Sequence, residues 1–496
     1  MNQYKSQIIS LLVSGIIFSC SSVAVEEKTN PAPLKAGVIH EKVACIEDAA
    51  TTYALYIPGG QRDTGTSENK SGQIARLFPV IIAFDPHGDG LLPVRLYKDL
   101  AEKYGFFIVG SNNSKNGLPP AEIDAIVATL FNEVKHVYPV DTNRIYLMGF
   151  SGGARIASLS AFYKVPVKGV VGCGAGIAGA SGAPRYKVDY FGIAGMADFN
   201  MNEVVELDYP LSQAGLRHVI TTFNGIHAWP PVEAMEEPFQ WFTLNAMKDG
   251  MIKKDNSLIE TIMAGFEKKI EFLKTQENLI DAAATCRKAI AFGEGLTAND
   301  KFSEKLKTIE KSAEYQEQVS YRKKIMVDEE KERKELMGAL SEKDAGWWKV
   351  YVGRRTKDEG RRRRDEGRRT RDEGRGTKVY SQAEWRLKED ALKDQRLLAF
   401  LRLLAYMNAT SVLTSKNEDA AAKIIDIYEI ADPENPEANY LHAVLLARKP
   451  ATGEALGQLG KAIEKGFSDK LRMTEQPEFA SMKDIPQFYD LLQKMK

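Results

Sequence analysis

The sequence predicts an α/β domain with a mostly parallel sheet and helices on both faces, followed by an all-helical region. Apolar runs of strand length alternate with helical patterns from residue 38 to about residue 247. Residues 144–164 join an apolar strand to a helix through a glycine-flanked turn. After Gly250 strand signals end and amphipathic helical patterns take over. Parallel strands carry their site beyond their carboxyl ends, so we expect functional residues at that edge.

Length and charge narrow the class of protein. The chain has 496 residues, and its 67 Lys and Arg balance 67 Asp and Glu. A chain of this length is expected to form about two to four domains. A net charge of zero gives no global indication of a nucleic-acid partner, and none is expected.

The first residues predict export. Lys5 precedes an apolar run over 8–18, which suits a secretory signal but is too short to span a bilayer. Residues 17–20, Ile-Phe-Ser-Cys, resemble a bacterial lipobox. The resemblance implies a signal peptide over 1–20, a lipidated Cys20, a tether over 21–35 and a place in the cell envelope, on the periplasmic or the surface face of the outer membrane. An ordinary signal peptide is the alternative.

The other cysteines predict no special chemistry. Cys45, Cys173 and Cys286 show neither a CxxC pattern nor a Cys/His spacing. We therefore expect no metal site, no disulfide framework and no cofactor.

The strands and helices of the first half follow in order. An antiparallel pair is expected first, then a loop over 59–71, then strands alternating with helices. The expected strands lie within 37–49, 51–58, 78–85, 106–114, 144–148, 167–176, 189–198 and 218–227, and the expected helices over 94–104, 121–136, 154–159 and 232–247. We expect residues 36–250 to form this domain with a core of its own.

The turn Gly149-Phe150-Ser151-Gly152-Gly153 matches G-x-S-x-G between strand and helix. A nucleophile at such an elbow has strained backbone, and the flanking glycines allow strand and helix to approach closely. The N–H of Gly152 lies at the start of the new helix, where it can stabilise an oxyanion. Ser151 is therefore the predicted nucleophile.

Strand polarity selects the partners of Ser151. Asp198 follows the end of a strand, whereas Asp189 opens one and Asp208 lies in a helix or turn. His227 lies at the end of the last strand, whereas His218 opens it. The chain order Ser151, Asp198, His227 is that of α/β-hydrolases, so these residues are the predicted catalytic triad.

The segment Gly225-Ile226-His227-Ala228-Trp229-Pro230 resembles the G-x-H-x-W-P segment of polyhydroxybutyrate depolymerase-like and feruloyl-esterase-like α/β-hydrolases. His87-Gly88 resembles the oxyanion-loop motif of these enzymes, and the resemblance covers 34–250. It implies that the N–H of Asp89 completes the oxyanion hole with that of Gly152. The sequence departs from the pattern in having Asp85-Pro86 before His87 and no large cap.

The expected cleft around the triad has an alternative at each loop. The predicted lining residues are His87, Gly88, Asn112, Asn113 and Trp229. The alternative for residues 86–90 is a turn that closes a strand, with Gly88 and Gly90 at positive φ. Asn112 and Asn113 could equally be a turn whose polar groups are all hydrogen-bonded.

The second half divides into three expected regions. Residues 251–350 are helical and charged, with the charges on solvated faces. Residues 351–380 are a low-complexity linker in which Arg-rich units of seven residues repeat from Arg354. Residues 381–496 resemble tetratricopeptide repeats, with Ala421 and Ala455 in a register near 34 residues. The resemblance implies a protein partner, and a helical cap packed on the hydrolase is the alternative.

Together these patterns predict a lipid-anchored serine hydrolase, most simply a carboxylesterase. The absence of a cap favours a bulky ester substrate, such as an esterified polysaccharide or a polyester. The alternatives are a serine peptidase of the same fold and a non-catalytic envelope scaffold that acts through its helical repeats.

Overall fold

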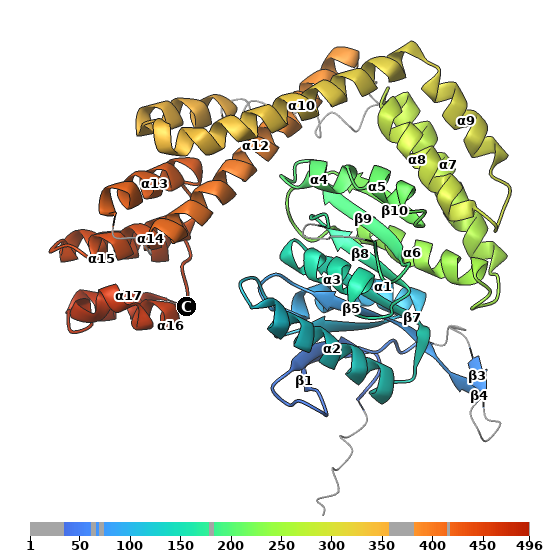
Figure 1. Ribbon diagram of the computed structural model, residues 1–496, viewed down its shortest axis with the longest axis horizontal. Coiled ribbons are helices and arrows are strands. Elements are labelled where there is room, and N and C mark those ends of the chain that lie inside the picture. The colour runs from blue at the N-terminus through green and yellow to red at the C-terminus, as the bar shows by residue number, and fades with distance from the viewer. Residues whose placement is uncertain are drawn as a thin grey trace, which may run out of the picture. The chain divides into compact units, whose positions relative to one another are not determined.

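A computed structural model describes residues 34–60, 66–68, 74–177, 183–356, 381–413 and 417–495. Its central sheet has eight strands in the order β1-β2-β6-β5-β7-β8-β9-β10 (Figure 1). The first two strands pair antiparallel, β2 also pairs antiparallel with β6, and the other pairs are parallel. This is the α/β-hydrolase fold class that the alternating pattern predicts, and the C-terminal region is helical.

The strands of this sheet are β1 (Ile39–Ala44), β2 (Thr52–Tyr56), β5 (Phe78–Phe84), β6 (Phe107–Ser111), β7 (Val140–Phe150), β8 (Gly169–Cys173), β9 (Asp189–Gly195) and β10 (His218–Phe223). The helices around it are α1 (Leu91–Tyr104), α2 (Pro120–Val137), α3 (Gly152–Tyr163), α4 (Met201–Val205), α5 (Asp208–Gln213) and α6 (Val232–Lys248). The expected loop over 59–71 is wrong in part, because β3 (Thr66–Glu68) pairs with β4 (Ile74–Arg76) as a small hairpin.

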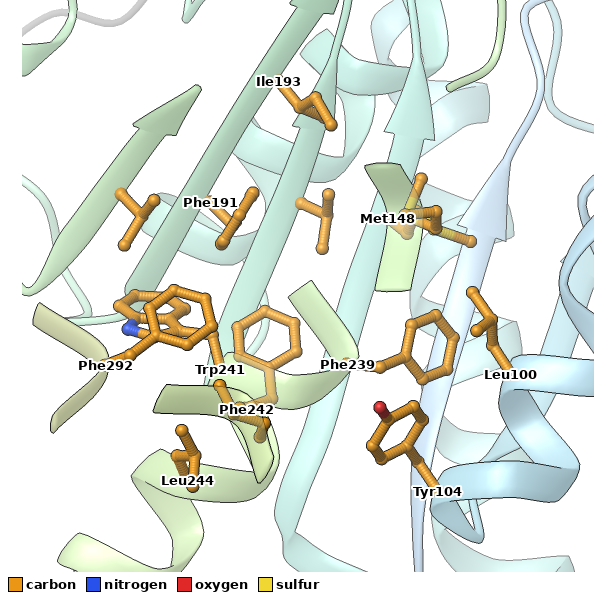
Figure 2. Packing of buried hydrophobic residues seen from close by; sticks show 14 of the residues in the cluster. Leu100, Tyr104, Met148, Phe191, Ile193, Phe239, Trp241, Phe242, Leu244 and Phe292 are labelled. Carbon is orange, nitrogen blue, oxygen red and sulfur yellow. The ribbon is translucent and has the colours of Figure 1, made fainter. Parts of the chain in front are cut away.

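The two faces of the sheet are covered by different helices. Alternate residues of a strand point to opposite faces, so Tyr146 and Met148 face one layer while Leu147 faces the other. The first layer contains α1 and α6, whose buried side chains form one cluster with the sheet. Figure 2 shows Phe239, Trp241 and Phe242 of α6 lying against the strands. Helix α3 packs on β7 and β8 from the other side.

This hydrophobic core does not end at Gly250. The cluster continues through α7 (Asn256–Thr275), α8 (Leu279–Gly293) and α9 (Asp300–Glu310), and it reaches Tyr315 at the start of α10 (Ala313–Glu342). Phe292 of α8 belongs to the same buried cluster as Trp241 of α6, and it contacts Phe266 edge to face with ring centroids 5.0 Å apart. The expectation of a separate core within 36–250 is therefore not met.

A second buried cluster belongs to the C-terminal helices. It joins the end of α10 to α12 (Gln382–Leu413), α13 (Glu418–Ala431), α14 (Pro436–Leu446), α15 (Thr452–Glu464), α16 (Lys470–Glu475), η1 (Pro477–Met482) and α17 (Pro486–Lys494). Ala421 and Ala455, which share a position in the expected repeat, are both fully buried. The register therefore coincides with core positions, and the repeat assignment itself stays a prediction.

Helix α12 is the one described helix that is long and apolar enough to cross a membrane. A core helix of a soluble protein passes the same test, and α12 packs against α10 and α13. Of the expected linker, residues 357–380 lie outside the described residues, whereas 351–356 end a helix that begins at residue 345. Cys20 and the signal region also lie outside them.

Candidate active site

The elbow that carries Ser151 has the predicted geometry. Ser151 lies between β7 and α3 with φ 52° and ψ −118°, a backbone conformation that residues other than glycine rarely adopt. Its N–H donates to the carbonyl of Cys173 at 2.8 Å, which helps to hold the strained residue. A Cβ added to Gly149 would lie 2.1 Å from the carbonyl oxygen of Gly153. A Cβ added to Gly153 would lie 2.0 Å from the carbonyl oxygen of Phe84. Both positions therefore require glycine.

The three side chains selected from the sequence form one hydrogen-bonded row. His227 Nε2 lies 3.0 Å from Ser151 Oγ, and His227 Nδ1 lies 2.8 Å from Asp198 Oδ1. Asp198 is fully buried, and its Oδ1 also accepts the N–H of Asn200 at 2.7 Å. Asp198 is three residues past the end of β9, and His227 is four past the end of β10, which is slightly beyond the expected strand end. This arrangement can remove the proton from Ser151 and deliver it to a leaving group.

Aromatic rings enclose the imidazole. The ring centroid of Phe150 lies 4.6 Å from that of His227, and the ring centroid of Phe199 lies 4.2 Å from it. Phe150 is the first of the two variable residues of G-x-S-x-G, and Phe199 directly follows Asp198. The sequence analysis singled out neither as a site residue. Their contacts restrict the ring to the orientation that both hydrogen bonds need.

Asp85, at which the sequence departs from the motif that it resembles, connects two loops of the site. The side chain is buried. Its Oδ1 accepts the N–H of His87 at 2.8 Å, and its Oδ2 accepts the indole N–H of Trp229 at 2.9 Å. Trp229 lies two residues after His227, and Tyr97 donates to the carbonyl of Pro230 at 2.7 Å. Trp229 thus contributes to loop positioning, and the departure at Asp85 has a structural purpose.

The loop expected to supply an oxyanion donor lies near the nucleophile. Gly152 opens α3, so its N–H has no partner within that helix. The N–H of Asn116 donates to the carbonyl of Pro86 at 2.8 Å, and the amide oxygen of Asn116 would lie 1.8 Å from a Cβ at residue 152. Asn116 therefore lies next to the nucleophile and the loop at once. The sequence analysis did not select Asn116. Its position two residues after the polar stretch Asn112 to Ser114 was the signal that could have identified it.

The remaining predicted cleft residues have mixed outcomes. The side-chain oxygen of Asn113 accepts the N–H of Thr52 in β2 at 2.7 Å, and its amide group donates to the carbonyl of Ala50. The amide group of Asn112 donates to the carbonyl of Glu41 in β1, so both side chains are hydrogen-bonded as the turn alternative expects. Gly88 has φ 78°, but Gly90 has φ −64°, so only the first needs positive φ. His87 is highly exposed. The carboxylate of Asp89 accepts the N–H of Leu92 at the start of α1 at 3.1 Å.

Other reactive side chains of the described residues are not part of this hydrogen-bonded row. Cys45, Cys173 and Cys286 are buried and free, and burial raises the pKa of Cys286 to about 11. No cluster of three metal-ligating side chains occurs among the described residues. A cavity of 780 Å³ is lined by Pro79, Arg144 and Lys254. Pro79 lies near the start of its strand, so this cavity is at the opposite edge of the sheet from Ser151.

Solved structures resemble about two fifths of the chain. They include a fluorophosphonate-binding serine hydrolase of Staphylococcus aureus (11% identity, 42% of this chain and 99% of that one, TM-score 0.33). An esterase of Pyrobaculum calidifontis has 14% identity over 43% and 87% of the two chains, with a TM-score of 0.34. A Bacillus cereus carboxylesterase has 19% identity over 40% and 95%, with a TM-score of 0.30. No model of a protein family matches the sequence, and no curated protein matches it.

Proposed function

We propose that this protein is a serine esterase that cleaves ester bonds through an acyl-enzyme. The observation that supports it is the row Ser151, His227, Asp198, with hydrogen bonds of 3.0 and 2.8 Å. Each group alone is common on protein surfaces. Their alignment at a strained elbow, with the acid fully buried, is what nucleophilic catalysis needs and has no evident structural benefit.

The chemistry follows from the geometry. Ser151 Oγ attacks the ester carbonyl carbon while His227 Nε2 takes its proton, and Asp198 stabilises the imidazolium. The N–H of Gly152 and that of Asp89 are the proposed donors to the oxyanion. The attack gives a tetrahedral intermediate, and its collapse expels the alcohol, which takes the proton from His227. Water, deprotonated by His227, then attacks the acyl group, releases the acid and restores Ser151.

The class of substrate and the location are part of this proposal. No large cap interrupts the described strands of the hydrolase, which favours a bulky or polymeric ester, such as an esterified polysaccharide. Lipidation at Cys20 would place the enzyme on the cell envelope. The helical region over 381–496 would hold a protein partner.

Probe labelling and mutation test the activity. A fluorophosphonate probe should label the wild type at Ser151, and Ser151→Ala or His227→Ala should each lower kcat on an activated ester by about 10³ to 10⁶. The double variant should lose little more, because the two groups act as one unit. Folded protein that the probe does not label would favour the scaffold alternative. A panel of acetyl, feruloyl, hydroxybutyryl and peptide substrates would separate an esterase from a peptidase.

A further inference from the structure

Three charged side chains in the C-terminal half form a buried cluster. Glu329 and Arg333 lie on α10, and Arg396 lies on α12. One oxygen of Glu329 accepts from Arg333 at 2.6 Å, and the other accepts from Arg396 at 2.8 Å. The side chains of Glu329, Arg396 and Arg333 are 0%, 2% and 13% exposed. The expectation that the charges of residues 251–350 lie on solvated faces is therefore wrong for Glu329 and Arg333.

The two arginines reach beyond the helices to the loop that carries the catalytic acid. This acid loop comprises residues 196–200. Arg396 Nη1 donates to the carbonyl of Met196 at 2.7 Å, and Arg333 Nη2 donates to the carbonyl of Phe199 at 2.6 Å. The two carbonyls lie on either side of Asp198 in the chain. The helical half therefore holds the backbone before and after the acid.

The acid loop is fixed on its other side by the loop that carries His227. The N–H of Met196 donates to the carbonyl of Phe223 at 2.8 Å, and the N–H of Ala197 donates to that of Gly225 at 2.9 Å. The N–H groups of Met196 and Ala197 thus bond to the end of β10 and the loop after it, whereas the carbonyls of Met196 and Phe199 bond to the arginines. Phe199 also packs its ring on His227. A shift of this loop would disturb the acid and the imidazole together.

The chemistry of the cluster suits positioning better than stability. Burying charges costs free energy, and a buried ion pair is often no more stabilising than apolar residues of the same size. A guanidinium, however, donates along fixed directions and can hold a carboxylate and a carbonyl at once. Since both oxygens of Glu329 are bonded, the two arginines are also fixed relative to each other. Such a rigid set defines the position of a loop closely.

We propose that Glu329, Arg333 and Arg396 are positioning residues for Asp198, so that the helices beyond Gly250 are part of the enzyme. This proposal rests on the proposed esterase function. The three residues act through the acid loop and do not touch the substrate. Their loss should therefore lower kcat and leave KM nearly unchanged, because only the geometry of the acid and the base is affected.

Two variants test the proposal without removing the buried charge of Glu329. Arg396→Lys keeps a cation beside Glu329 but loses the N–H group that donates to the carbonyl of Met196. Arg333→Met keeps an apolar side chain of similar length but removes the N–H group that donates to the carbonyl of Phe199. The matched control is Arg322→Gln, which breaks another ion pair between α10 and α12, with Glu389 at 2.7 Å, and does not reach the acid loop. Circular dichroism checks that each variant is folded.

The expected result is that Arg396→Lys and Arg333→Met lower kcat on p-nitrophenyl acetate by about 10- to 100-fold, with KM within about twofold of wild type. Arg322→Gln should keep kcat within about twofold. Added to Asp198→Asn, Arg396→Lys should cost almost nothing further, since both changes act on the same group.

Two results would overturn the proposal. Folded Arg396→Lys and Arg333→Met variants with the kcat of wild type would show that the contacts do not position the acid. Full additivity of Arg396→Lys with Asp198→Asn would show that any effect does not pass through the acid. A wild type without Ser151-dependent labelling would instead overturn the esterase function, and the positioning role with it.

Discussion

Phe292→Ala tests whether the hydrolase sheet and the helices beyond Gly250 fold as one unit. Phe292 lies on α8, is fully buried, and belongs to the cluster that includes Trp241 and Tyr146. Replacing a buried phenylalanine by alanine costs about 3 to 5 kcal/mol, because apolar contacts are lost and a cavity remains. At about 2 to 4 °C per kcal/mol for a domain of this size, the midpoint should fall by roughly 10 °C.

The assay is the temperature at which half of the esterase activity is lost, measured beside the melting of helical circular dichroism. Phe479→Ala is the matched control, since Phe479 is fully buried in the second cluster and packs on Tyr440 and Phe488. It should lower the melting temperature of the C-terminal helices more than the temperature of inactivation. Unchanged inactivation of Phe292→Ala would refute a shared core and restore an independent domain over 36–250.

Three further changes test other parts of the molecule. Asp85→Asn should lower kcat about tenfold in steady-state assays, because one of two N–H donors loses its acceptor; unchanged kcat would contradict this. Burial lowers the pKa of Lys248 from 10.5 to about 8. The unfolded chain therefore binds more protons between these values, and wild type should gain stability relative to Lys248→Met as the pH rises. Denaturant unfolding at about pH 7.5 and pH 9.5 measures the difference, and a constant difference would exclude this linkage. Cys20→Ala should release the protein from membrane fractions with its activity intact, and an unchanged membrane fraction would argue against lipidation.

The sequence could predict the hydrogen-bonded row of Ser151, His227 and Asp198 because each of these residues follows a local signal. Ser151 lies in a five-residue pattern at a strand end, and the acid and base occupy loops at the same edge of a parallel sheet. Strand order and direction then bring them together without further information. The glycines at Gly149 and Gly153 carry the same local signal, because backbone approaches within about 2 Å of a Cβ exclude every other residue.

The positioning cluster had no such signal. Arg396 and Met196 are 200 residues apart, and no periodicity links them. On a charged helix a buried arginine looks the same in the sequence as a solvated one, since only the tertiary partner distinguishes the two. The boundary expected at Gly250 had the same weakness. Strand signals do end there, but the apolar face of α7 and α8 completes the layer begun by α6.

The surroundings of Asp198 explain why its loop needs outside support. One carboxylate oxygen receives His227 and Asn200, whereas Oδ2 has no hydrogen-bond partner among the described residues and lies 2.9 Å from the position of a Cβ at Gly174. A buried charge with one oxygen unpaired is costly, and it gains most when a proton arrives on the imidazole. That gain depends on the distance between carboxylate and ring. In the proposed mechanism, the arginine contacts to the carbonyls of Met196 and Phe199 hold this carboxylate at the distance from which it stabilises the imidazolium.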